Sequence, residues 1–169
     1  VIDALNSLSK KRRPNYLIIG DGPFREELER YTTEMGLEDY VHFAGYISDH
    51  ESVFANLKSA DIMAMPSVDE AFGIAYLEAM ACGSPAIGCD LSAVPEVIDD
   101  GENGYLIERN PDSLEEALRK LLSDHKKIKE FAAWTTSKEF EVRLWHFGFA
   151  VLLYNAWLMV AFLVQVGLD

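Results

Sequence analysis

The chain has 169 residues and a formal net charge of −13, which comes from 28 Asp and Glu against 15 Lys and Arg. This length suits one domain with little left over. The negative charge argues against binding to a nucleic-acid backbone, since basic residues gather only at 10–13, a run that we interpret as a solvated helix end.

The first part of the chain alternates short apolar runs with amphipathic segments. The patterns predict helices over 1–8, 24–35 and 51–59, and strands over 16–19, 41–44 and 61–65. Glycines mark the turns between them, and Asp49 or Ser48 is a candidate cap for the third helix.

The alternation continues as far as residue 131. Apolar runs predict strands over 85–88 and 105–107, and helices are predicted over 74–81, 92–98 and 114–122. Asp112 or Ser113 is a candidate cap for the last of these helices. Short strands that alternate with helices predict an α/β fold with a doubly wound parallel sheet.

The stretch 66–83 carries the most chemical information. It reads as the end of a strand, a short acidic loop and a buried helix of small and apolar residues. A helix that begins at the carboxyl end of a parallel strand offers free backbone N–H groups and a positive dipole end, which suit a phosphate. Glu70 stands before this helix and Glu78 lies inside it, where a carboxylate is costly to bury without a partner.

Two stretches carry a resemblance to a known family. Glu70 and Glu78, with seven residues between them, resemble the signature of retaining GT-B glycosyltransferases of the group 1 or family 4 type, within the stretch Glu-Ala-Phe-Gly-Ile-Ala-Tyr-Leu-Glu-Ala-Met-Ala-Cys-Gly. Pro-Glu-Val-Ile followed by Asp-Gly-Glu-Asn-Gly-Tyr-Leu-Ile, at 95–98 and 100–107, is a second hallmark. The resemblance covers about residues 1–131 and implies a Rossmann-like, nucleotide-sugar-binding half of a GT-B fold.

The resemblance implies roles for residues of the central stretch. Glu70 would hold hydroxyls of the donor sugar and is the catalytic candidate. The backbone N–H groups of Gly73 and Ile74, which follow Phe72, would contact phosphate or sugar. Glu78 would accept hydrogen bonds from the ribose hydroxyls. Ala71 departs mildly from the family pattern, in which many members have Gly or Pro.

Two further turns are candidates for contact with the donor. The resemblance places Gly20 and Gly22 at its border and the nucleotide base against Tyr46 and Ile47. From the residues alone, Gly20 and Gly22 equally suit a plain strand-to-helix turn, and Tyr46 and Ile47 equally suit ordinary packing at a strand end.

No metal or cofactor is expected beyond the nucleoside-diphosphate sugar substrate. Cys82 and Cys89 have no His or Cys partner at metal-ligand spacing, which favours a reduced cytoplasmic chain over a disulfide scaffold. In the resembled family, a strand, a loop with an Arg and a Lys that hold the diphosphate, and an N-terminal acceptor domain precede the first helix. We expect this chain to start after all of them.

The character of the sequence changes after residue 131. Between 147 and 166 only Asn155 and Gln165 are clearly polar, which predicts an apolar helix long enough to span a bilayer. Residues 135–169 resemble the C-terminal end of an insertion-sequence transposase from salt-adapted archaea. We therefore expect two parts, a domain at 1–131 and an apolar tail at 132–169 that is a fusion remnant, a membrane anchor or a helix packed on the sheet.

The sequence thus predicts the donor-binding domain of a retaining glycosyltransferase, which transfers sugar to an acceptor hydroxyl only when the protein is complete. The alternatives are a nucleotide-binding fragment without turnover and a membrane-tethered or mobile-element remnant. The expected partners are the nucleotide sugar and the N-terminal acceptor domain, without nucleic acid. Residues 144–168 are candidates for self-association or membrane contact, so the expected location is the cytoplasm, with possible attachment to a membrane.

Overall fold

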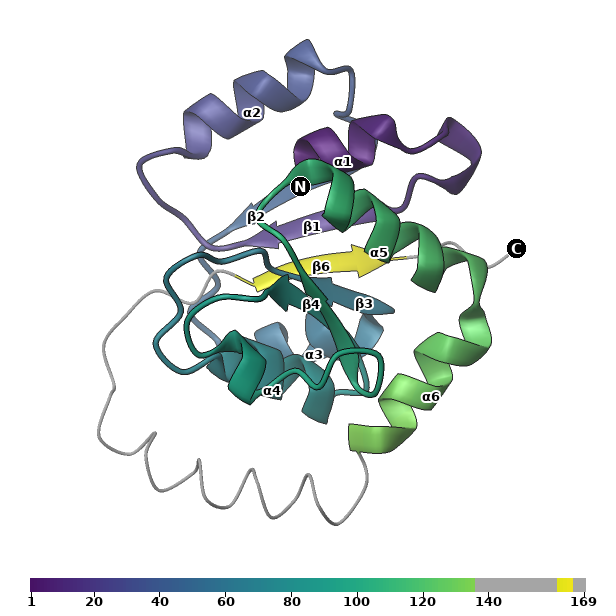
Figure 1. The fold of residues 1–169 in the computed structure, drawn as a ribbon. Helices are drawn as coiled ribbons and strands as arrows, with labels where there is room; N and C mark the ends of the chain where they lie inside the picture. Colours follow the sequence, from purple (N-terminus) through teal and green to yellow (C-terminus); the bar gives the residue numbers. More distant parts are fainter. Residues whose placement is uncertain (136–160, 166–169) are drawn as a thin grey trace.

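The computed structural model describes residues 1–135 and 161–165 (Figure 1). Its helices are α1 (Ile2–Ser7), α2 (Arg25–Glu34), α3 (His50–Ser59), α4 (Ile74–Ala81), α5 (Pro111–Ser123) and α6 (His125–Thr135), with 3-10 turns η1 (Lys10–Arg12) and η2 (Val94–Glu96). Its strands are β1 (Asn15–Ile19), β2 (Val41–Gly45), β3 (Ile62–Ala64), β4 (Ala86–Cys89), β5 (Gly104–Ile107) and β6 (Ala161–Gln165).

All six strands belong to one sheet, in the order β2-β1-β6-β3-β4-β5. β1 pairs with β2 in parallel, and β3, β4 and β5 are also parallel neighbours. Helices connect these strands, which confirms the predicted α/β fold with a doubly wound parallel sheet. The strand order reverses between β1 and β3, because β2 lies outside β1 on one side while β4 and β5 lie outside β3 on the other.

Alternate residues of the strands pack into two hydrophobic cores on opposite faces of the sheet. Ile62 and Ala64 of β3 pack in the core beneath α1 and α5, whereas Met63 between them packs against α3 and α4. This alternation follows from the pleat, which turns successive side chains to opposite faces. Figure 1 shows α1 and α5 on one side of the sheet and α3 and α4 on the other. The sheet is therefore covered on both faces, as a parallel sheet requires.

The helix starts confirm one predicted cap and correct another. The Asp49 carboxylate accepts hydrogen bonds from the backbone N–H groups of Glu51 and Ser52 at 3.2 and 3.0 Å, so Asp49 caps α3. At α5 the cap is Asn110, whose side chain accepts from the Ser113 N–H at 2.8 Å. The prediction of Asp112 or Ser113 was wrong because Pro111 already occupies the first helical position, where its fixed φ suits a helix start.

β6 corrects part of the predicted apolar helix. Residues Ala161–Gln165 form a strand that pairs antiparallel with both β1 and β3. An apolar run does not by itself separate a buried strand from a buried helix, and here the sheet supplies backbone partners on both sides. The rest of the predicted helix and of the transposase-like segment lies outside the described residues. Among the described helices, none is both long and apolar enough to cross a membrane.

The predicted boundary between residues 131 and 132 stays a prediction. α6, which the sequence analysis did not predict, spans this boundary, and Phe131 on it is fully buried in the core beneath α1 and α5. Phe131 also makes an edge-to-face contact with Tyr105 of β5, with ring centroids 5.4 Å apart. Phe131 therefore ties α6 to the core of the domain.

Gly104 yields a test of the packing between β4 and β5. A Cβ at this position would lie 2.2 Å from the backbone oxygen of Ala86, which cannot move without breaking the ladder. We expect Gly104→Ala to lower the free energy of unfolding by about 1–3 kcal/mol or more, measured by urea denaturation. Gly22→Ala is the matched control, since nothing lies within 4 Å of its Cβ. Equal losses in the two variants would contradict the model of this strand pair.

Candidate functional site

The candidate site residues lie on loops that follow the parallel strands or at the helix starts beside them. Gly20 and Gly22 follow β1, Tyr46 and Ile47 follow β2, and Glu70, Phe72, Gly73 and Ile74 follow β3, with Glu78 on α4. The carboxyl ends of parallel strands meet at one edge of a sheet, and a doubly wound sheet binds its ligands there, where the strand order reverses. The fold therefore brings the predicted residues to the expected edge, from three separate parts of the sequence.

Gly73 sets the turn from β3 into α4. Its φ of 68° and ψ of 29° are left-handed, and a Cβ would lie 3.2 Å from both the Tyr76 ring and the Val97 side chain. Both the backbone angle and the space therefore favour glycine. The Gly73 N–H donates to the Glu70 carboxylate at 3.1 Å, so Glu70 is held against the start of the helix. The other Glu70 oxygen remains an acceptor for a ligand.

Two hydrogen bonds join the turn before α4 to neighbouring parts of the fold. The hydroxyl of the buried Tyr76 donates to the backbone oxygen of Met65, which joins α4 to the end of β3. Burial raises the pKa of Tyr76, so this hydroxyl keeps its proton and stays a donor. The backbone oxygen of Glu70 accepts from the Ala93 N–H at 3.3 Å, which fastens the loop after β4 to the turn. The turn is thus fixed before any ligand arrives.

Glu78 is the most unusual group at this edge. One of its carboxylate oxygens is buried and has no hydrogen-bond partner among the residues that the structure describes. Burial raises the pKa of Glu78, and the nearby His50 at the start of α3 opposes this rise. A buried acceptor without a partner costs free energy, which is recovered when a ligand supplies a donor. The sequence analysis assigned His50 no role, because its proximity to Glu78 arises only when α3 packs beside α4.

The loops after β1 and β2 are fastened to each other. The Gly20 N–H donates to the Gly45 oxygen at 2.8 Å, and both glycines have positive φ. The Arg25 guanidinium lies over Gly45, where a Cβ would be 2.8 Å from its Nη1. Arg25 is itself held by Glu29 at 2.8 Å and by Asp21 at 3.8 Å. Sequence analysis missed Arg25, because only the packed loops show that it holds the segment that leads to Tyr46 and Ile47.

Exposure separates the two candidates for base contact. Tyr46 is 68% exposed, so its ring is available to stack on a planar ligand. Ile47 is half-buried and packs against the core beneath α3 and α4, so its side chain serves the fold while its backbone follows the fixed Gly45. Phe72, 39% exposed, adds a second accessible ring on the β3–α4 loop.

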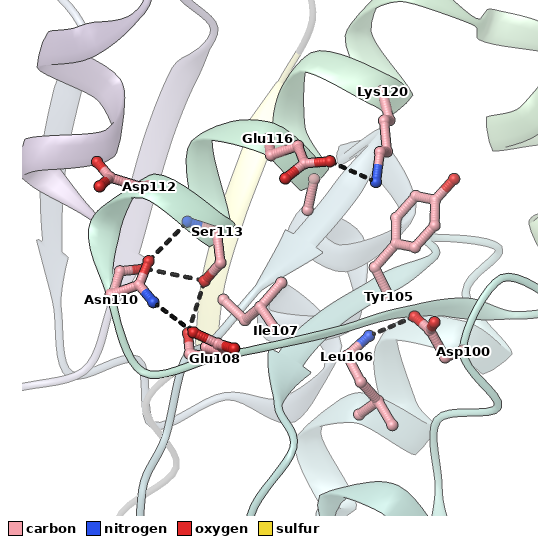
Figure 2. Close-up of a pocket in the computed structure, with 11 residues that line it drawn as sticks. Asp100, Tyr105, Leu106, Ile107, Glu108, Asn110, Asp112, Ser113, Glu116 and Lys120 are labelled. Atoms are coloured by element: carbon pink, nitrogen blue, oxygen red, sulfur yellow. Dashed lines mark hydrogen bonds and ion pairs between the residues drawn. The ribbon is translucent and has the colours of Figure 1, made fainter.

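A pocket of about 540 Å³ lies away from these loops, between β5 and α5 (Figure 2). It contains none of the predicted site residues. Four carboxylates line it, and its one lysine, Lys120, is already paired with Glu116 at 2.9 Å. Figure 2 also shows the Asp100 carboxylate accepting from the Leu106 N–H, at 2.9 Å, so this acid serves the strand edge. The acidic lining does not suit an anionic donor, so we keep the loops after β1, β2 and β3 as the candidate site.

Within the described residues, no group of three or more His, Cys, Asp or Glu side chains is arranged to hold a metal ion. The cysteines Cys82 and Cys89 are both free. The chemistry that the described part of the site offers is hydrogen bonding. Backbone N–H groups surround the start of α4, two carboxylates accept, and exposed aromatic rings border the edge.

Comparison with known proteins decides the family. The model of the family described as "Glycosyl transferases group 1" matches residues 1–136. The chain belongs to this family. A GDP-mannose-dependent alpha-(1-6)-phosphatidylinositol dimannoside mannosyltransferase from Mycobacterium tuberculosis is 37% identical over 123 residues, which are 72% of this chain and 31% of that protein. The chain thus spans about a third of the length of this glycosyltransferase.

Solved structures share the fold of this chain. The C-terminal domain of a family member, LpcC, from Francisella tularensis is 32% identical, with a TM-score of 0.72 over 82% of this chain and 76% of that chain. HepE from Anabaena, solved in complex with UDP, is 28% identical, with a TM-score of 0.69 over 78% of this chain and 36% of that one. These likenesses confirm the predicted GT-B fold of the domain. The roles of the individual site residues stay predictions.

Glu78 yields a prediction about stability and pH. Because burial raises its pKa above the unfolded value, the folded chain binds this proton more tightly, and stability is lost as pH rises through the folded pKa. We expect Glu78→Met to unfold at a higher temperature than the parent near neutral pH, by about 2–4 °C for each kcal/mol regained. The gain should shrink at mildly acidic pH, as followed by thermal circular dichroism.

Glu27→Met, at an exposed position on α2, is the matched control for this measurement. It removes the same negative charge from the chain without removing a buried acceptor. A gain of equal size in both variants would mean that the effect comes from the overall charge of −13 and not from burial of Glu78.

Proposed function

We propose that this chain is the donor-binding domain of a retaining glycosyltransferase and that its ligand is a nucleoside-diphosphate sugar. The observation that carries the proposal is the buried, unpartnered oxygen of Glu78, on the helix that starts at the sheet edge where ligands bind. Ribose presents two neighbouring hydroxyl donors, which match a carboxylate that can accept at two oxygens. A bound nucleotide would thus remove the cost of burying this group.

The remaining assignments follow from the same placement. The backbone N–H groups of Gly73 and Ile74, at the positive end of the α4 dipole, face the phosphate or the sugar, and the Gly73 N–H is shared with the Glu70 carboxylate to which it donates at 3.1 Å. Glu70, fixed by Gly73, accepts from hydroxyls of the donor sugar through its remaining lone pairs. The nucleotide base lies against Tyr46 and the backbone of Ile47, with Gly20 and Gly22 at its border.

The relatives support a nucleotide sugar as the ligand class without fixing the base. The mycobacterial relative is GDP-mannose-dependent, and the Anabaena protein was also solved with UDP-glucose. A site in which Glu78 binds the ribose and the base stacks on the exposed Tyr46 ring accepts either nucleotide. Base selectivity would then depend on the hydrogen bonds that the backbone around Ile47 offers.

The retaining outcome is part of the proposal. In this mechanism the diphosphate leaves and the acceptor hydroxyl attacks from the same face, so the anomeric configuration is kept. Stabilisation of the leaving diphosphate, which the N–H groups at the start of α4 supply, and placement of the acceptor then determine the rate. Nuclear magnetic resonance of the anomeric proton in the product of a form of the protein that transfers sugar tests this point.

Glu78→Gln tests the ribose assignment. A hydrogen bond to a charged acceptor contributes roughly 1.5–3 kcal/mol, so we expect about a ten- to hundredfold weaker affinity for UDP-glucose or GDP-mannose by calorimetry. The loss should shrink for a donor with a 2′-deoxyribose, which cannot make the full contact. Glu27→Gln on α2 should bind like the parent chain. If ribose and deoxyribose donors lose affinity equally, Glu78 does not bind ribose.

A second prediction separates binding from transfer. The matched residues are about a third of the mycobacterial relative, and we place the acceptor site of a whole enzyme in the remaining part. We expect the chain to bind donor weakly and to transfer no sugar across broad panels of donors and acceptors at high protein concentration. Turnover that scales with the amount of chain, and is lost in Glu70→Gln, would refute the view that this chain binds without catalysis.

A further inference from the structure

β6 is the one strand among those described that runs against its neighbours. It lies between β1 and β3 and pairs antiparallel with both, whereas every other paired strand is parallel to its neighbour. Figure 1 shows it in yellow at the middle of the sheet. Leu163 is in register with Leu17 on β1 and with Met63 on β3, so β6 contacts both halves of the sheet at the same residue.

The sheet has no direct pairing between these halves. β1 and β2 form one half, and β3, β4 and β5 form the other. Neighbouring strands lie about 4.8 Å apart, so β1 and β3 are separated by about twice that distance. Without a strand between them, each would present a row of unpaired backbone groups within the sheet, which is unfavourable unless water or another strand pairs them.

The candidate site is divided in the same way. Gly20, Gly22, Tyr46 and Ile47 belong to the half with β1 and β2, and Glu70, Gly73 and Glu78 belong to the half with β3. Each half is tied internally, by the Gly20–Gly45 hydrogen bond at 2.8 Å and by the Glu70–Ala93 hydrogen bond at 3.3 Å. A ligand that contacts both halves therefore needs them at a fixed spacing.

Other contacts between the halves are weaker or less directional. The hydroxyl of Tyr16 on β1 reaches the backbone oxygen of Ala64 on β3 at 3.4 Å, a long hydrogen bond. Ile18 of β1 and Ile62 of β3 belong to the same apolar core, and such packing is favourable but fixes no register. Backbone pairing through a common strand, by contrast, fixes both the spacing and the register of the two halves.

We propose that Ala161–Gln165 is a positioning strand that joins the two halves of the donor site and fixes their spacing. The identity of the ligand that the two halves bind rests on the proposed function. The way in which the halves are joined rests on the backbone register alone. According to this proposal, residues 161–165 are part of the nucleotide-binding domain. The sequence analysis instead placed them in a tail separate from residues 1–131.

A cross-link in the full-length chain tests the placement of β6. Paired residues of antiparallel strands have Cα atoms about 4.5–5.5 Å apart, which suits a disulfide. We expect Leu17→Cys with Leu163→Cys to form this disulfide under mild oxidation, as shown by peptide mass mapping. Ile18→Cys with Leu163→Cys, one residue out of register and on the opposite face, should not. Equal linking of both pairs, or no linking of the first, would overturn the proposal.

A second experiment tests the positioning role. Leu163→Pro removes a backbone donor from the centre of β6, and Leu163→Ala keeps it. In the proline variant we expect the β1 and β3 amides to exchange hydrogen about tenfold faster or more, and affinity for UDP-glucose and GDP-mannose to fall by a similar factor, while the alanine variant stays closer to the parent. Unchanged exchange and unchanged affinity in the proline variant would refute a positioning role.

The two experiments separate this inference from the proposed function. If the parent chain binds neither nucleotide sugar, the proposed function fails, and the cross-link and hydrogen exchange still decide where β6 lies. If the cross-link forms and the proline variant binds donor as the parent does, β6 is in the sheet and does not position the site. If the proline variant does not fold, donor affinity of the cross-linked pair supplies the test: a link in the observed register should leave affinity unchanged, and a loss of about tenfold on linking would refute a positioning strand in this register.

Discussion

The left-handed turn at Gly73 is the constraint on which the candidate site depends. It ends the loop 65–73 that joins β3 to α4, and a Cβ there would lie 3.2 Å from both Tyr76 and Val97, a tight contact at a left-handed backbone angle. The same turn aims the Gly73 N–H at Glu70 and sets the start of the helix that carries Glu78. A residue with a Cβ would be strained at this φ of 68°, and relief of the strain would shift the turn that holds the two carboxylates.

The described residues offer a bound diphosphate hydrogen bonds from backbone N–H groups more than attraction by unpaired positive charges. A diphosphate is anionic, yet the chain carries a formal charge of −13, and Arg25 at this edge is occupied by Glu29 and Asp21. Neutral N–H groups at the start of α4 are therefore the main donors that the described residues offer to phosphate. The carboxylates suit the hydroxyls of a sugar, which they accept from without repulsion.

Stability and ligand binding oppose each other at Glu78. Its buried oxygen has no partner among the described residues, which is unfavourable for the fold, and the hydroxyl of the proposed ligand would supply the donor that this oxygen lacks. Tyr76 shows the opposite arrangement on the same helix, since its buried hydroxyl is satisfied by the Met65 oxygen and serves the structure. Two polar side chains on one helix thus take different roles because only one of them has a partner within the protein.

The sequence by itself determined the parallel strands of residues 1–131 and most of the helices between them, and it predicted the edge at which they would bind a ligand, but it missed α6. Periodicity, glycines and caps are local signals, so the strands, α4 and the Asp49 cap were predictable within a few residues. The sequence did not determine contacts between elements that are distant along the chain. His50 near Glu78 and Arg25 over Gly45 appear only after packing.

The apolar run near the end of the chain shows most clearly what the hydrophobic pattern cannot predict. Its hydrophobicity is equally consistent with a helix and with a buried strand, because both bury the same side chains. Only the open position between β1 and β3, with backbone partners on both sides, made Ala161–Gln165 a strand. Hydrophobic pattern is a local property of the sequence, whereas the hydrogen-bond partners of a central strand are supplied by the assembled sheet.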